Sequence, residues 1–132
     1  MKFMMIMSFK ADQESARKSI VNWPKQDVNA HIQFMKDLNM RLKERGEFVD
    51  AQGLAWPNEA KLVRAGRNGQ PITDGVFPES KEFLIGYWII DVDGPERAYE
   101  IAAEASAAPG MGGEPLNMPI EVRQILGAPQ PE

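Results

Sequence analysis

The sequence predicts a small α+β domain of the ferredoxin-like type, in which two helices cover one face of an antiparallel sheet. The first observation is the order of the expected elements, which is strand, helix, two or three strands, a further strand, helix and strand. The second is that two segments, 27–45 and 95–107, carry apolar side chains at helical spacing. The third is that residues 120–125 alternate apolar and polar side chains, as a strand with one buried face does.

The composition supports one domain with a small core. The chain has 132 residues, of which 43% are hydrophobic and 26% are charged, close to an ordinary globular mix. We expect a single domain at 1–126 and a flexible C-terminal tail at 127–132. A homodimer interface would supplement so small a core.

Charge and cysteine content exclude several function classes. The net charge is −4, and no basic cluster forms the footprint that nucleic-acid binding needs. The chain has no cysteine and a single histidine, which excludes disulfides and thiol chemistry and argues against a zinc or iron site. We therefore expect neither a metal nor another cofactor.

The apolar N-terminal run is better explained as a buried strand than as a targeting segment. Charged residues follow it directly, without the small-residue cleavage site of a signal peptide. No stretch approaches the roughly 18 apolar residues of a membrane span. We expect a cytoplasmic protein without membrane contact, and the lack of cysteine fits that compartment.

The first half of the chain predicts a strand, a loop and a helix. Residues 2–9 are apolar on both faces, which is typical of a central strand, and 10–26 form a polar loop or partly helical excursion. Asp27 is expected to cap a helix over 27–45 that Gly46 ends. The apolar face of this helix consists of Val28, Phe34, Met35, Leu38 and Leu42, with His31 on the same face. The other side consists of Lys36, Asn39, Lys43 and Glu44.

The middle of the chain predicts two strands, at 47–54 and 60–65, with Trp56-Pro57 turning the chain between them. Residues 67–70 contain Asn-Gly and predict a hairpin turn, from which 71–72 return toward the next segment.

The last third of the chain predicts a strand at 83–92 and a helix at 95–107 that begins with Pro95. Ala98, Ile101, Ala102 and Ala105 give that helix a face small enough to pack closely on a sheet. Residues 109–119 form a glycine- and proline-rich loop before the final strand, 120–125.

Several segments resemble a known family. Residues 73–82 read Thr-Asp-Gly-Val-Phe-Pro-Glu-Ser-Lys-Glu and resemble the signature loop of the DGPF-domain branch of the YCII-related family, with Val76 in place of the signature proline. The opening run 1–7 and the segments 46–54, 83–88 and 120–123 also resemble this family, in the same order.

The resemblance implies a dimeric α/β barrel, in which two ferredoxin-like sheets face one another across a dimer axis. It implies a pocket between sheet and helices, and chemistry through a histidine–aspartate pair. The related proteins include a cofactor-free dehalogenating lyase. Genes of the DGPF branch often lie near genes for extracytoplasmic-function sigma factors, which leaves a protein partner open.

His31 is the first candidate catalytic residue. Its place near the start of the helix, on the sheet-facing side, favours a neutral imidazole that accepts a proton. YCII-related proteins have a histidine at a similar place in this helix. The alternative is a structural histidine that bonds a main-chain carbonyl.

Asp74 is the second candidate catalytic residue, because a carboxylate would orient His31 or a substrate group. The alternative is an Asx turn, with Gly75 supplying the positive φ.

Five further side chains are candidates for substrate binding. Arg64 could clamp a carboxylate, because its guanidinium is bidentate. Glu79 and Lys81 lie in the signature loop, where surface ion pairing is the alternative. Trp23 and Tyr87 could line an apolar pocket, with core packing as the alternative. Since Tyr87 and Trp88 are adjacent in a strand, they should point to opposite faces, one toward the helices and the other toward the dimer interface.

Two functions remain open from the sequence. The first is a cofactor-independent lyase or isomerase that acts on small organic acids by His31 general-base chemistry, with Asp74 and Arg64 in support. The second is a non-catalytic dimer that binds a small molecule or a protein partner.

Overall fold

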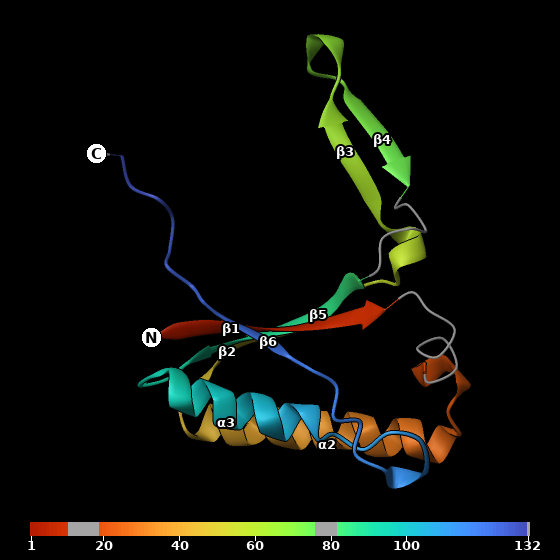
Figure 1. Ribbon diagram of the computed structural model, residues 1–132, viewed down its shortest axis with the longest axis vertical. Helices are drawn as coiled ribbons and strands as arrows, with labels where there is room; N and C mark the ends of the chain where they lie inside the picture. The colour runs from red at the N-terminus through yellow and green to blue at the C-terminus, as the bar shows by residue number, and fades with distance from the viewer. Residues whose placement is uncertain (11–18, 76–81, 132) are drawn as a thin grey trace.

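The structure is a computed structural model, and it describes residues 1–10, 19–75 and 82–131. In this part of the chain, four strands form a main sheet in the order β2-β5-β1-β6, and every neighbouring pair is antiparallel. Figure 1 shows both long helices on one side of this sheet. The elements are β1 (Lys2–Lys10), α2 (Lys25–Glu44), β2 (Phe48–Gly53), β3 (Lys61–Ala65), β4 (Pro71–Gly75), β5 (Glu82–Asp91), α3 (Pro95–Ser106) and β6 (Glu121–Gln124).

The strand order confirms the predicted ferredoxin-like α+β fold. β1 lies between β5 and β6, which confirms that the first strand is central. The sheet of the single chain stays open, so the barrel of two sheets remains a prediction about a dimer. None of the helices in the described ranges is long and apolar enough to cross a membrane.

The core lies between the sheet and the two helices. Alternate residues of the central strands face it, so that Phe3 pairs with Ile90 and Met5 with Trp88, and all four side chains are buried. The predicted small-residue face of α3 is confirmed, since Ala98, Ile101, Ala102 and Ala105 are all buried. From α2, Leu38 and Leu42 complete this core.

The start of α2 corrects one prediction. The helix begins at Lys25, and the main-chain carbonyl of Pro24 accepts hydrogen bonds from the amides of Asp27 and Val28 at 2.9 and 3.1 Å. Asp27 therefore lies in the first turn, and its side chain makes no cap bond. Its carboxylate instead accepts a hydrogen bond from the Gly112 amide at 3.0 Å and ties the 109–119 loop to the helix. Gly46 follows the helix with a φ of 71°, as predicted.

β3 and β4 form a separate two-stranded hairpin that is not part of the main sheet. The predicted Asn-Gly turn is confirmed, because Asn68 and Gly69 have φ values of 61° and 74°. All ten strand residues of this hairpin are exposed. Figure 1 shows the hairpin projecting from one end of the sheet, on the side opposite the helices. The sequence pattern does not distinguish such a projecting hairpin from two further strands of the main sheet.

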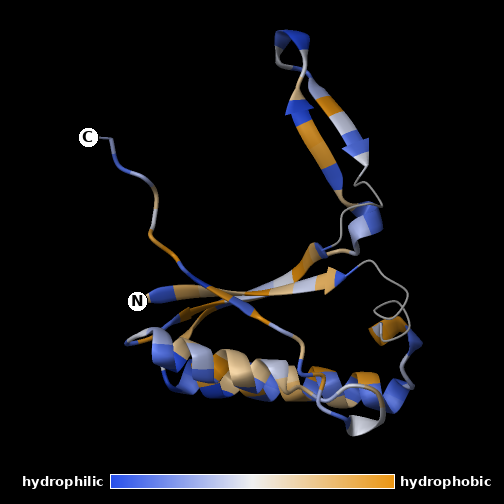
Figure 2. Ribbon diagram, viewed as in Figure 1, coloured by the Kyte–Doolittle hydropathy of each residue, from blue (hydrophilic) through white to orange (hydrophobic). Residues whose placement is uncertain are grey.

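In the part of the chain that the structure describes, neither long helix lies on the second face of the main sheet (Figure 1). Its centre is apolar, because Met4 and Ile6 of β1 pair with Ile89 and Tyr87 of β5. Figure 2 shows apolar residues along the strands of the main sheet. We call this surface the open face.

Candidate functional site

His31 lies on the sheet-facing side of α2, half-buried, with one ring nitrogen in a defined hydrogen bond. Its Nδ1 is 3.0 Å from the main-chain oxygen of Pro109. Because a carbonyl oxygen only accepts, this bond requires the hydrogen on Nδ1. In the neutral imidazole, the Nε2 lone pair is then left to accept a proton.

One ring contact and one hydrogen bond of the neighbouring loop also help to position the imidazole. The ring of Trp23 meets the ring of His31 edge to face, with centroids 5.4 Å apart and planes at 79°. The Asp27–Gly112 hydrogen bond fixes the loop that presents the Pro109 carbonyl. His31 is the seventh residue of α2, so it lies a turn further from the helix N-terminus than the sequence suggests.

A cavity of about 220 Å³ adjoins His31 between α2 and the edge of the sheet. It is lined by Met7, His31, Met35, Asn39, Ala51, Gln52, Gly53, Tyr87 and Trp88. His31 is therefore not sealed in the core. We call this space the His31 cavity.

Asn39 is a site residue that the sequence interpretation placed wrongly on the outer side of the helix. Its Oδ1 accepts a hydrogen bond from Nε1 of the buried Trp88 at 2.8 Å. That bond leaves the amide NH₂ of Asn39 as a donor for the cavity. The signal was present, since residues 31, 35 and 39 follow one another at a spacing of four and share a helix face.

Tyr87 and Trp88 point to opposite faces of β5, as predicted. Trp88 faces the helices, whereas Tyr87 donates a hydrogen bond from its hydroxyl to Asp50 Oδ2 at 3.3 Å. Desolvation raises the pKa of Tyr87, and the charge and hydrogen bond of Asp50 raise it further. Tyr87 therefore borders the His31 cavity along the strand, while its phenol belongs to the open face.

The remaining predicted residues lie away from His31. Asp74 and Arg64 are on the hairpin, where Leu62 pairs with Asp74 and Arg64 with Ile72. Both are exposed, and neither lines the His31 cavity of its own chain. The structure thus places Trp23 against His31 and Tyr87 at the edge of the His31 cavity, but it brings neither Asp74 nor Arg64 to His31. Glu79 and Lys81 lie outside the described residues.

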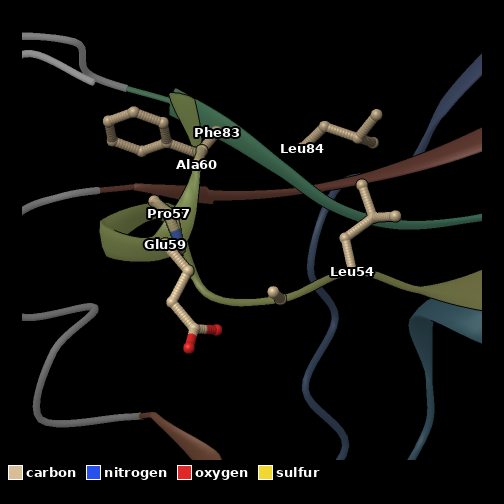
Figure 3. A pocket seen from close by; sticks show the side chains of 7 residues that line it. Leu54, Pro57, Glu59, Ala60, Phe83 and Leu84 are labelled. Atoms are coloured by element: carbon tan, nitrogen blue, oxygen red, sulfur yellow. The ribbon is translucent and has the colours of Figure 1, made fainter. Parts of the chain in front are cut away.

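A second cavity, of about 320 Å³, lies where the hairpin leaves the sheet. Figure 3 shows its lining, with Leu54 and Leu84 on one side and the Glu59 side chain extending away from Phe83. Glu59 is the one charged residue among those that line this cavity, and the other lining residues are apolar.

Metal binding finds no support in the described ranges, where no three His, Asp or Glu side chains are placed to hold an ion.

Comparison with known protein families finds a match to one of them. A model of the YCII-related domain matches residues 1–112, which includes β1 to α3, His31 and the Pro109 carbonyl that bonds it. No curated protein matches the sequence.

Proposed function

The chain belongs to the YCII-related family, and we propose that its His31 cavity binds a small organic acid from which His31 removes a proton. The observation that carries this proposal is the Nδ1–Pro109 hydrogen bond beside a cavity. It selects the tautomer in which Nε2 is the base.

The proposed chemistry is an elimination or an isomerisation. Nε2 takes a proton from a substrate carbon and becomes part of an imidazolium, which the Pro109 carbonyl stabilises through Nδ1–H. The electron pair left on carbon either expels a leaving group or is protonated again at a different carbon. Neither course needs a metal or a redox cofactor.

The cavity supports a small substrate. Its volume of about 220 Å³ is below the roughly 300–1,000 Å³ of pockets for drug-sized ligands. The Asn39 amide offers a hydrogen-bond donor to an anionic oxygen. Met7, Met35 and Trp88 offer apolar contacts to a carbon skeleton.

The first experiment is a thermal-shift screen of small organic acids and lactones. A ligand at a hundredfold excess over its Kd stabilises the folded state by about 2.7 kcal/mol. We expect at least one acid to raise the melting temperature of the wild type and not that of His31→Ala. The matched control is Ile32→Ala, which removes an exposed neighbour on the same helix and should respond like the wild type. Equal shifts for all three proteins would contradict binding at His31.

A second candidate function is ligand binding without catalysis. Its support is that, among the described residues, the group bonded to His31 is a neutral carbonyl and not a carboxylate. Proton exchange separates the two candidates. If His31 is a base, NMR in D₂O should show deuterium entering a carbon position of the bound acid with the wild type and not with His31→Gln. Binding without such exchange favours the second function.

A further inference from the structure

Among the described residues, the β3–β4 hairpin pairs with no further strand, and all ten of its strand residues are exposed. An isolated two-stranded hairpin is marginally stable in water, and this one exposes three large apolar side chains. They are Leu62, 52% exposed, Val63, 62% exposed, and Ile72, 36% exposed. Figure 2 shows the apolar segment in the middle of β3, between charged ends.

One side of the hairpin combines apolar and charged groups. The register pairs Leu62 with Asp74 and Arg64 with Ile72, so these four side chains share one face, and Val63 and Thr73 share the other. Within the described residues, the side chains of Arg64 and Asp74 form no hydrogen bond or ion pair. We call the side with Arg64 and Asp74 the charged face of the hairpin.

The net charge of the hairpin indicates the charge of the surface to which it would bind. Residues 61–75 hold three cationic side chains and one carboxylate, a net charge of +2. Because the whole chain carries −4, the remainder carries −6. A second copy of this chain therefore offers the hairpin a body of opposite charge.

Geometry indicates where on a second copy the hairpin would lie. The hairpin and the open face point to the same side of the molecule (Figure 1). Two sheets that pack face to face are about 10 Å apart, whereas a five-residue strand spans roughly 16 Å. The hairpin is therefore long enough to pass the partner's sheet and reach the level of the partner's sheet–helix layer.

The His31 cavity opens at the end of the sheet from which the hairpin rises, because Gly53 lines the cavity and Leu54 follows it toward the hairpin. A two-fold axis parallel to the strands places corresponding ends of the two sheets over one another.

We propose that each β3–β4 hairpin crosses to a second copy of the chain and places Arg64 and Asp74 at the mouth of that copy's His31 cavity. The inference rests on the proposed function of this cavity. Arg64 would bind the carboxylate of the acid through its two parallel N–H donors, a group that the single-chain cavity lacks. Each site then consists of residues from two copies.

Cross-linking tests this arrangement cleanly, because the natural chain has no cysteine. The double variant Gly53→Cys/Leu62→Cys puts one thiol at the cavity and one on the charged face. A Cβ at Gly53 meets no atom within 4 Å, so the substitution fits. After treatment with a short bismaleimide, we expect a covalent dimer of twice the 14.8 kDa chain mass on a denaturing gel. The single variants should give little of it.

The matched control is Gly53→Cys/Val63→Cys, whose second thiol replaces a side chain that is also more than half exposed but lies on the opposite face of the hairpin. It should give several-fold less covalent dimer. Equal yields from the two double variants, or a monomer by light scattering of the wild type, would overturn the proposal.

The outcomes separate the two proposals. A monomer that still shows the His31-dependent thermal shift leaves the proposed function intact and removes only the hairpin arrangement. A specific cross-link without any His31-dependent shift would support the hairpin arrangement and would contradict the proposed function of the His31 cavity.

Discussion

At the scale of single residues, the site depends on two side chains of α2 whose hydrogen bonds are fixed by other elements. His31 is oriented by a carbonyl of the loop after α3, and Asn39 is oriented by Trp88 of β5. Each bond engages one polar atom and leaves the other for a ligand. The site is therefore oriented by the packing of α2 against both the sheet and the 109–119 loop.

Replacing Trp88 by Phe should be strongly destabilising. The substitution removes the donor to Asn39 and leaves a void at a side chain that is 3% exposed. We expect the free energy of unfolding to fall by about 2–3 kcal/mol. Urea unfolding measures this, with Tyr99→Phe at an exposed position as the control. A loss no larger than that of the control would show that the Asn39–Trp88 bond has little effect on stability.

The Glu47–Arg97 pair should make stability depend on pH in the acid range. The Arg97 guanidinium donates hydrogen bonds to both carboxylate oxygens, at 2.8 and 2.9 Å. These bonds lower the pKa of Glu47 below its ordinary value of 4.5; burial opposes the shift, and the charges of Arg97 and Arg45 add to it. Because the folded-state pKa is the lower one, the stabilisation is present above pH 4.5 and is lost as pH falls through that folded value.

Glu47→Gln should therefore lose about 1 kcal/mol at pH 7. The difference from the wild type should shrink as pH falls below 4.5. Urea unfolding across this range measures it. Glu100→Gln is the control, because Glu100 bonds the same arginine from an exposed position. A difference that does not change with pH would contradict the assignment.

At the scale of elements, the sequence predicts those helices, strands and turns whose position depends on local residue patterns. The ends of α2 and α3, the central strand and the Asn-Gly turn follow from spacing, glycine and proline, and all are present within two residues or so. Polarity alone predicts that Asn39 faces water, whereas its spacing from His31 places it on the side where it bonds Trp88. The departure of the hairpin from the sheet was not predicted, because strand pattern does not specify which sheet a strand joins.

The irregular pairing of β5 gives an element-scale prediction. The register shifts between Met7 and Ser8, beside Gly86. A Cβ at Gly86 would meet Met7 Cε at 3.0 Å and the Gln52 carbonyl at 3.2 Å. Gly86→Ala should cost about 1–3 kcal/mol and distort the adjoining His31 cavity. Gly53→Ala is the control, since nothing lies within 4 Å of its new Cβ. Similar urea midpoints for the two variants would contradict this prediction.

The hairpin should unfold without the core. Gly69 has a φ of 74°, so Gly69→Ala is strained by about 1 kcal/mol. We expect faster hydrogen exchange in β3 and β4 and unchanged exchange in β1 and β5, because the hairpin contributes no residue to the buried core. Exchange detected by mass spectrometry checks this, with Gln70→Ala as the control. Faster exchange in β1 would show that the hairpin supports the core.

At the scale of the whole molecule, the topology joins distant parts of the chain. β1 pairs with β5 on one side and with β6 on the other, as in the contact between Phe3 and Gln124. The order of elements and the helix faces were sufficient to predict this arrangement, since few topologies bury two amphipathic helices on one sheet. The position of Asp74 and Arg64 relative to His31 could not be predicted, because it depends on tertiary and quaternary placement of the hairpin.

The central position of β1 has a consequence for synthesis on the ribosome. Among the described residues, the sheet partner of β1 that comes first along the chain is Glu82, which pairs with Lys10. Until the residues of β5 have left the exit tunnel, the apolar β1 strand lacks its β5 partner. Nascent chains stalled before β5 should therefore be substrates for chaperones that hold exposed strands, and they should aggregate when those chaperones are depleted.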